Sequence, residues 1–245
     1  MKPMMIVFLT FFLFLSGNIC AADYLTSLDG LLKQYVKSGT KEGIVSALVD
    51  YKGWSTDTRH KQTMDAIQKI DPTSLTPDEK KAFWINAYNF LTVDLMIRNP
   101  SVKSIKDLGS VLQSPWEKYE WDIHGDMLTL DKIEHKILRK MSDPRIHMAI
   151  VCASLSCPDL RAEAYRADKI NSQLDNQAQR FLANPSKGLK KSAAGLTLSP
   201  IFKWFEDDFG GEQGVLIFVS RFAQGVTVDN SINDNFAYNW NLNQP

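Results

Sequence analysis

The sequence predicts a single α+β domain with a central buried helix, a small mixed or antiparallel sheet and several packed helices. Three observations lead to this prediction. One long segment is apolar on almost every side, and two short segments alternate around glycine in the manner of β-hairpins. Helical and strand patterns are interleaved, and no internal repeat or Gly/Ser-rich linker divides the chain. The interleaving favours one domain over two.

The clearest local signal predicts a helix over residues 76–99. Thr76 is a good N-cap and Pro77 fits the first helical position. Glu79 lies three residues after Thr76, which completes a capping box. The helix should end before Pro100, because the residue that precedes a proline avoids the helical backbone conformation. Apolar residues surround this segment, so we expect it at the centre of the domain.

The remaining elements are predicted from the spacing of apolar residues. Apolar residues at helical spacing predict further helices, strict alternation predicts hairpins, and one continuous apolar run predicts a buried strand. The expected helices are 24–37, 130–140, 168–182, 201–211 and 211–224; the expected hairpins are 119–130 and 189–199; the buried strand is 145–152, and 235–243 is expected to add a terminal strand.

The first 22 residues are typical of a signal peptide. Lys2 is followed by an apolar run from Met4 to Leu15, and small residues around Ala22 then offer a cleavage site. A run of this length is too short to span a bilayer of about 30 Å. We therefore expect residues 23–245 to form the mature domain, periplasmic or secreted, without a transmembrane helix.

Cys20 offers an alternative to simple cleavage, because bacterial lipoproteins carry a lipid on a cysteine just after the leader. A small residue usually precedes that cysteine, but here Ile19 does. We therefore expect no lipid anchor. Cleavage after Ala22 removes Cys20 and leaves Cys152 and Cys157 in an oxidising compartment.

The charge balance excludes one class of partner. The chain has 28 basic and 28 acidic residues. No strongly basic face follows from such a balance, so no nucleic-acid partner is expected. No motif in the sequence calls for a cofactor, and nothing in it identifies a partner.

The candidate chemistry lies in the stretch HMAIVCASLSCPDLR, residues 147–161. Cys152 and Cys157 could form a disulfide, provide a reactive thiol, or remain inert buried thiols. A metal site is the weakest alternative, because C-x4-C is not a usual zinc-binding spacing and there is no second cysteine pair.

The sequence favours Cys157 as the more activated thiol. Pro158 fits the first position of a helix, so Cys157 would lie at an N-cap, where the helix dipole lowers a thiol pKa. Asp159 would oppose this effect. Ser154 belongs to a small-residue loop whose amides could bind an oxyanion. In a strand, His147 and Cys152 would face opposite sides, so they could form a nucleophile–base pair only if the strand ended early.

Other polar residues are weaker candidates. Glu134 and His135 are adjacent on a predicted helix, so only one of them can face a given pocket squarely. Asn86 and Asn89 share one face of the central helix; their buried amides need hydrogen-bond partners, and bracing of loops is the simpler role.

Several residues are interpreted as structural. His60 and His124 lie in polar surroundings and are expected at the surface. The tripeptide Asp208-Phe209-Gly210 matches a kinase motif, but the other kinase motifs are missing from the sequence. The aromatic residues of the same stretch are expected in the core rather than in a ligand site; they are Phe202, Trp204, Phe205 and Phe209.

Five motifs together resemble a bacterial and plant family known as domain of unknown function 547. They are AFWINAYNFLTV, LTLDKIEHKILR, DPRIHMAIVCASLSCPDLRAEAY, IFKWFEDDFG and YNWNLN, and the resemblance runs from about Leu25 to Asn243. It implies a single domain typical of exported or envelope-associated bacterial proteins, and it carries no activity. The family signature falls on Asn86, Asn89, Glu134, His135, His147, Cys152, Ser154, Cys157 and Pro158.

Two hypotheses follow. The favoured one is a periplasmic binding or scaffold domain in which the cysteines form a disulfide. The alternative is a cysteine-dependent hydrolase or acyl-transfer enzyme. In that enzyme Cys157 or Cys152 is the nucleophile and His147 or His135 is the base, with Glu134 or Asn86 orienting the histidine.

Overall fold

The computed structural model describes residues 16–245 of the chain. The helices are α1 (Ser16–Tyr35), α2 (Tyr51–Ser55), α3 (Thr58–Ile67), α4 (Pro77–Arg98), α5 (Pro115–Lys118), α6 (Ile170–Leu182), α7 (Ile201–Trp204), α8 (Glu206–Phe209) and α9 (Gly211–Phe222). The strands are β1 (Val36–Lys41), β2 (Ile44–Val49), β3 (Glu120–Ile123), β4 (Asp126–Thr129), β5 (Leu189–Ser192), β6 (Gly195–Leu198) and β7 (Ile232–Asn235). The predicted α+β class is confirmed.

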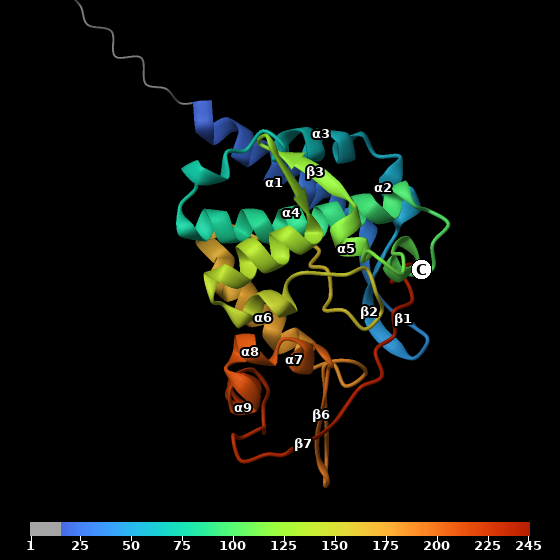
Figure 1. The fold of residues 1–245 in the computed structure, drawn as a ribbon, viewed down its shortest axis with the longest axis vertical. Helices are drawn as coiled ribbons and strands as arrows, with labels where there is room; N and C mark the ends of the chain where they lie inside the picture. The colour runs from blue at the N-terminus through green and yellow to red at the C-terminus, as the bar shows by residue number, and fades with distance from the viewer. Residues whose placement is uncertain (1–15) are drawn as a thin grey trace, which may run out of the picture.

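Helix α4 crosses the middle of the molecule, as Figure 1 shows. The predicted capping box is present, because the Thr76 backbone N–H donates to the Glu79 carboxylate and the Glu79 N–H donates back to the Thr76 hydroxyl. Every residue from Ala82 to Met96 is buried. The central buried helix is therefore confirmed.

The sheets are small and separate. Strands β1 and β2 form one antiparallel pair, and β3 and β4 form another. In the third sheet β5 and β6 are antiparallel, whereas β6 and β7 are parallel. The hairpins predicted over 119–130 and 189–199 are confirmed. The β1–β2 hairpin was not predicted.

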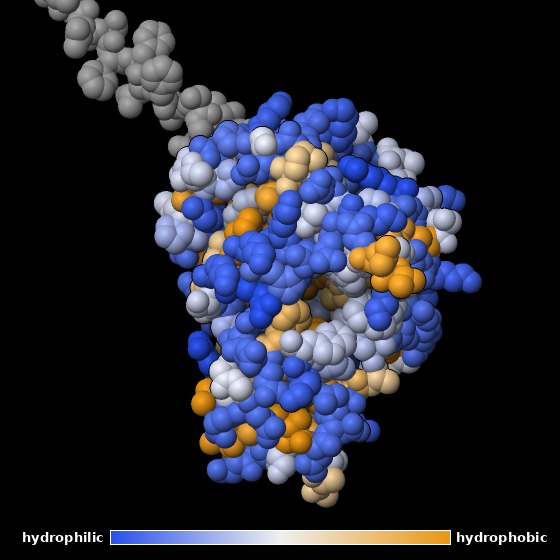
Figure 2. Space-filling view, in the orientation of Figure 1, coloured by the Kyte–Doolittle hydropathy of each residue, from blue (hydrophilic) through white to orange (hydrophobic). Residues whose placement is uncertain are grey.

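The apolar side chains form two clusters. The larger one surrounds α4 and includes α1 and the β3–β4 hairpin. The smaller one is built from α6, the β5–β6 hairpin and helices α7 to α9. Figure 1 shows this smaller part below α4, where α7, α8 and α9 lie together. Figure 2 shows that the face between the two parts is hollowed.

The strand predicted over 145–152 is wrong. Residues Pro144–Met148 form a 3-10 helix instead, because Pro144 occupies its first turn and the Asp143 carboxylate accepts a hydrogen bond from the Arg145 N–H. The expected N-cap at Cys157 is also wrong. In the described chain the next helical turn after this cysteine begins only at Ala167.

The ends of the chain also differ from expectation. Helix α1 begins at Ser16 rather than near residue 24, and residues 1–15 of the predicted leader lie outside the described part of the chain. Strand β7 ends at Asn235, so the strand predicted over 235–243 is wrong apart from one bridge between Leu242 and Ser154. Within residues 16–245, no helix has the length and apolar character needed to cross a membrane.

Candidate functional site

The cysteines lie in an irregular segment, residues 150–158, which we call the cysteine loop. It is held along one side by residues 238–243, the C-terminal strap. The Leu155 N–H donates to the Asn241 carbonyl, and the Asn243 N–H donates to the Ala153 carbonyl. Ala153 has a φ of 59°, a left-handed conformation that a non-glycine residue adopts only when its surroundings impose it. The strap therefore fixes the shape of the loop.

The strap is itself anchored to the hairpin β1–β2. The Val49 N–H donates to the Asn243 carbonyl, and the Asn243 side-chain amide donates to the Ala47 carbonyl. The Tyr51 hydroxyl donates to the Asn243 side-chain oxygen over 2.7 Å. In Figure 1 the red C-terminal segment accordingly returns from β7 to end beside β1 and β2.

The start of the cysteine loop is braced by α4. The Asn89 amide donates to the Ala149 carbonyl and accepts a hydrogen bond from the Val151 N–H. Asn86 brackets Tyr165 in the same way, through the carbonyl and the N–H of that residue. Both asparagines thus brace loops from within the core.

The sulfur of Cys152 is surrounded by hydrogen-bonding groups. The Ser154 hydroxyl lies 3.1 Å from it, the Tyr238 hydroxyl 3.2 Å and the Cys157 sulfur 3.0 Å. Burial raises the pKa of the Cys152 thiol, but hydrogen bonds from Cys157, Ser154 and Tyr238 outweigh it and hold the pKa below its ordinary value. Of the two thiols, Cys152 is therefore the one whose pKa is lowered.

Cys157 is the more buried of the two thiols, with 4% of its surface exposed. Its sulfur accepts a hydrogen bond from the Cys152 N–H over 2.9 Å and lies within hydrogen-bonding distance of the Cys152 sulfur, at 3.0 Å. Burial, together with the neighbouring Cys152 thiolate, raises the pKa of Cys157. A sulfur–sulfur bond measures about 2.05 Å, so at 3.0 Å the two cysteines are free thiols. No helix begins at Cys157, so the helix dipole on which the sequence preference for this thiol rested is absent.

Both sulfurs line a cavity of about 300 Å³ between the two parts of the molecule. Aromatic and aliphatic side chains make up most of its wall, and the hollow on this face is visible in Figure 2. The aromatic lining residues are Tyr88, Trp116, Trp204, Phe205, Tyr238 and Trp240. The prediction that Trp204 belongs to the core is wrong, because Trp204 stacks on Trp240 at 5.7 Å between ring centres and remains half exposed. Phe205 is partly buried and packs against the smaller apolar cluster as well as lining the cavity. Phe202 and Phe209 are in the core as expected.

Glu134 brings a carboxyl group to the same cavity. It lies on a π-helix, Lys132–Leu138, a rare form that is common at functional sites. The Tyr88 hydroxyl donates to its Oε2 over 3.1 Å. Burial raises the pKa of Glu134 to about 7; Tyr88 lowers it and the charge of Cys152 raises it further. A carboxyl group with this pKa exchanges protons near neutral pH.

His147 also lines the cavity, but it is paired with Asp208 rather than with a cysteine. Its Nε2 donates to Asp208 Oδ2 over 2.8 Å, and its ring stacks on Phe205. Burial lowers the pKa of His147 to about 4, so its ring is neutral at pH 7. Its Nδ1 is buried and has no hydrogen-bond partner among the described residues.

His135 is turned toward Arg139, whose guanidinium donates to its Nδ1 over 2.7 Å. Both Glu134 and His135 line the cavity, although only Glu134 is buried. Between residues 16 and 245, no hydrogen bond joins a histidine to either sulfur. His147 and His135 bond instead to Asp208 and Arg139, so their role as the base for a cysteine stays a prediction.

The other two histidines, His60 and His124, lie away from the cavity. His124 is half exposed, as expected, but His60 is largely buried and bonds to Asp94 over 3.0 Å. No group of three or more acidic, histidine or cysteine side chains suited to a metal ion occurs in the described range.

The structure thus brings most of the candidate residues to one cavity. Those that line it are Glu134, His135, His147, Cys152 and Cys157, and Ser154 bonds to the Cys152 sulfur. Sequence reasoning missed Tyr238, Tyr88 and Asp208. The only signal for Tyr238 was the motif YNWNLN, which the resemblance includes.

A family model described as "Protein of unknown function, DUF547" matches residues 72–182. The resemblance to DUF547 is confirmed. The matched segment contains α4, the π-helix with Glu134, the cysteine loop and α6. No curated protein and no solved structure matches the chain. The DUF547 description names no activity, so the chemistry has to be argued from the site.

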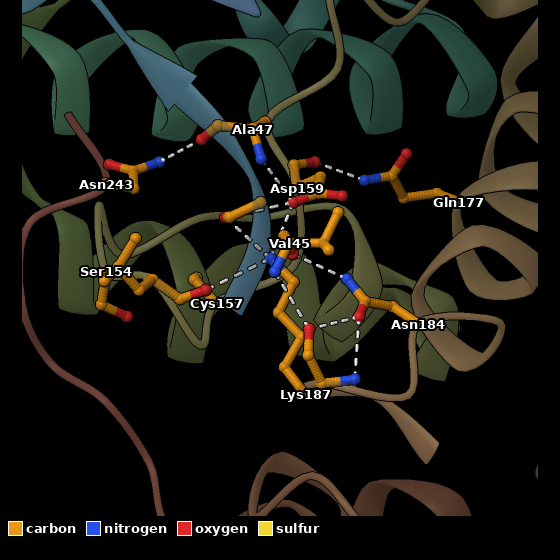
Figure 3. A network of polar contacts seen from close by, with 12 residues as sticks. Val45, Ala47, Ser154, Cys157, Asp159, Gln177, Asn184, Lys187 and Asn243 are labelled. Carbon is orange, nitrogen blue, oxygen red and sulfur yellow. Dashed lines mark hydrogen bonds and ion pairs between the residues drawn. The ribbon is translucent and has the colours of Figure 1, made fainter. Parts of the chain in front are cut away.

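A buried lysine just outside the DUF547 segment supports the cysteine loop from the other side. The Lys187 side chain is fully buried, and its ammonium donates to Asp159 over 2.7 Å, to the Ser46 hydroxyl over 2.9 Å and to the Leu155 carbonyl over 3.3 Å. Figure 3 shows Lys187 and Asp159 at the centre of this network. Asp159 is thus neutralised by Lys187 and by the Ala47 N–H instead of opposing a thiolate.

Proposed function

We propose that the protein is a cysteine-dependent enzyme that forms a covalent intermediate on the sulfur of Cys152. The observation that supports this most is the set of hydrogen-bonding groups around that sulfur, from Ser154, Tyr238 and Cys157. They stabilise the thiolate, which is the nucleophilic form of cysteine. The half-buried sulfur also opens on an aromatic cavity large enough for a small organic group.

Each group near the sulfur has a role in this proposal. Cys152 attacks an electrophilic acyl carbon or sulfur atom, and it needs no histidine base because its hydrogen bonds already favour the thiolate. Glu134 is partly protonated near pH 7 and donates a proton to the leaving group. The aromatic walls hold an apolar part of the substrate. The reaction class includes acyl transfer and hydrolysis.

The test is the rate of Cys152 alkylation by iodoacetamide between pH 5 and pH 9, followed by mass spectrometry. We expect the rate to titrate below the pKa of about 8.5 of a free cysteine. In Tyr238→Phe the lost hydrogen bond to a charged group, about 1.5 kcal/mol, should raise that pKa by about one unit. Tyr119→Phe is the matched control, because Tyr119 does not line the cavity. A wild-type rate that rises only above pH 8, unchanged in Tyr238→Phe, would refute the proposal.

A binding or scaffold domain is the second candidate. The braces made by Asn86 and Asn89 and the aromatic cavity support it, since both would serve ligand binding without chemistry. It predicts that replacement of Cys152 by serine leaves ligand binding intact. The alkylation profile separates the two candidates, because a scaffold gives its cysteines no reason to be activated.

We also propose that the protein is exported and cleaved after Ala22. The support is the sequence of the first 22 residues. Cleavage would leave the Tyr24 contact with Asn86 intact. N-terminal sequencing of the protein from a periplasmic extract should begin at Asp23. A chain that still starts at Met1 would contradict cleavage.

A further inference from the structure

The two thiols are arranged unequally around one cavity. Cys152 is half buried and opens on the cavity, whereas Cys157 is buried and lies 3.0 Å away from it, sulfur to sulfur. A nucleophile for acyl transfer does not need a second thiol in contact with it. A second thiol at this distance can instead attack a sulfur already bonded to Cys152. Both cysteines line the cavity, and the unequal burial favours Cys152 as the first to react, because it is the more exposed of the two.

We propose that the site reduces disulfides, with Cys152 as the attacking thiolate and Cys157 as the resolving thiol. This inference rests on the proposed function of Cys152 and specifies its substrate as a disulfide. The cysteine loop already holds the sulfurs within about 1 Å of bonding distance, so their bond requires only a small local movement. The strap and Asn89 hold the loop in this shape.

The reaction proceeds in two exchanges. The Cys152 thiolate attacks one sulfur of the substrate disulfide, a mixed disulfide forms, and the other half of the substrate leaves as a thiolate. Cys157 then attacks the Cys152 sulfur, its proton passes to the second leaving thiolate, and a Cys152–Cys157 disulfide remains. Two electrons move from the protein to the substrate, and a dithiol reductant returns them to the protein.

Neighbouring groups favour the second exchange. The Cys152 N–H already points at the Cys157 sulfur over 2.9 Å and stabilises negative charge that develops there. The Ser154 and Tyr238 hydroxyls stabilise the negative charge that develops on the Cys152 sulfur when the Cys152–Cys157 disulfide is reduced again. Each sulfur therefore has a hydrogen-bond donor nearby in the step in which that sulfur becomes negatively charged.

The cavity favours disulfides that carry an aromatic or apolar group without negative charge. Most of its wall is made of aromatic and aliphatic side chains, and its acidic side chains are Asp131 and Glu134. No lysine or arginine is among the residues that line it. An anionic disulfide such as oxidised glutathione should enter poorly.

The experiment uses the full chain with Cys20→Ser, which leaves Cys152 and Cys157 as its two cysteines. This chain serves as wild type and as the background of the variants; it is reduced with dithiothreitol and then freed of it. It is mixed with 4,4′-dithiodipyridine, a neutral aromatic disulfide, and thiopyridone release is followed by absorbance. We expect wild type to release two thiopyridones per protein and to end with a Cys152–Cys157 disulfide that peptide mass mapping identifies.

Cys157→Ser should release one thiopyridone and retain the other half of the probe on Cys152. Cys152→Ser should react at least tenfold more slowly, and oxidised glutathione should react at least tenfold more slowly than the aromatic probe with wild type.

The outcomes separate this inference from the proposed function. If Cys152 is activated in the alkylation test but wild type keeps a mixed disulfide, as Cys157→Ser does, the resolving role of Cys157 is wrong and the proposed function stands. If Cys152 reacts like a free thiol in both tests, both are wrong. Cys157→Ala is the control for folding. If its circular dichroism spectrum matches that of wild type, the loss of the second thiopyridone in Cys157 variants is not caused by unfolding.

Discussion

At the scale of single residues, the charge on Cys152 comes from hydroxyl and thiol donors rather than from a helix dipole. The Ser154 and Tyr238 hydroxyls and the Cys157 thiol lie within 3.2 Å of the sulfur, and they are fixed by the loop and the strap. Such donors act at short range in a half-buried setting, where hydrogen bonds to a charged group are strong. The thiolate should therefore resist screening by salt better than one stabilised by distant charges.

Glu134 gives the folded state a distinct pH dependence. Its pKa rises from 4.5 to about 7, so between these values the folded protein keeps a proton that the unfolded chain has lost. Stability contributed by this group is present below pH 4.5 and is lost as the pH rises through 7. Glu134→Gln keeps this side chain neutral at every pH. We expect the difference in free energy of unfolding between Glu134→Gln and wild type to be about 2–3 kcal/mol more favourable to the variant at pH 8 than at pH 4.

The measurement is urea unfolding at both pH values. Glu212→Gln is the control, because Glu212 is exposed in the first turn of α9 and should change stability equally at both. A difference between wild type and Glu134→Gln that does not vary with pH would show that Glu134 titrates normally.

At the scale of elements, the C-terminal strap is the part on which the site depends most. Asn243 is 4% exposed and joins the strap to Tyr51 and to the Ala47 carbonyl. Asn243→Ala removes both bonds and leaves buried partners unsatisfied, so we expect a loss of about 1–3 kcal/mol and slower alkylation of Cys152. Asn241→Ala is the control, since that side chain bonds only to the exposed Glu42. Equal losses of stability and reactivity in the two variants would contradict a specific role for the Asn243 anchor.

The elements that the sequence predicts correctly are those determined by local signals. Helix α4 has its capping box and its proline at the end, and the hairpins around Gly125 and Gly195 follow from strict alternation. The cysteine loop was predicted wrongly because its apolar run resembles a strand. Its actual shape depends on the Asp143 cap and on a strap that lies far along the chain.

Contacts between residues far apart in the sequence also limit how much of the site could be predicted. Residue type and family resemblance were enough to select Glu134, Cys152 and Cys157. Tyr238 could not be selected by pattern, because it meets Ser154 across 84 residues of sequence. The pairing of His147 with Asp208 likewise spans 61 residues, so the sequence alone suggested a cysteine as the partner instead.

At the scale of the whole molecule, Lys187 joins three segments that are distant in sequence: β2, the cysteine loop and the turn before β5. Its ammonium is buried, and its pair with Asp159 lies against the Leu155 carbonyl. Removal of one partner of a buried ion pair leaves the other charge unpaired, so Lys187→Met should cost about 3 kcal/mol. Lys190→Met, an exposed change on β5, is the control. Urea midpoints that fall equally in the two variants would show that Lys187 contributes no more than a surface lysine.

The strap also has a consequence for the order of events during synthesis. Ribosomes make the cysteine loop first and Tyr238 only 84 residues after Ser154. Until residues 238–243 have been made and have folded onto the loop, Cys152 lacks the Tyr238 hydroxyl as a neighbour. If Cys152 reacts as we propose, its full reactivity would mark a chain whose strap is in place.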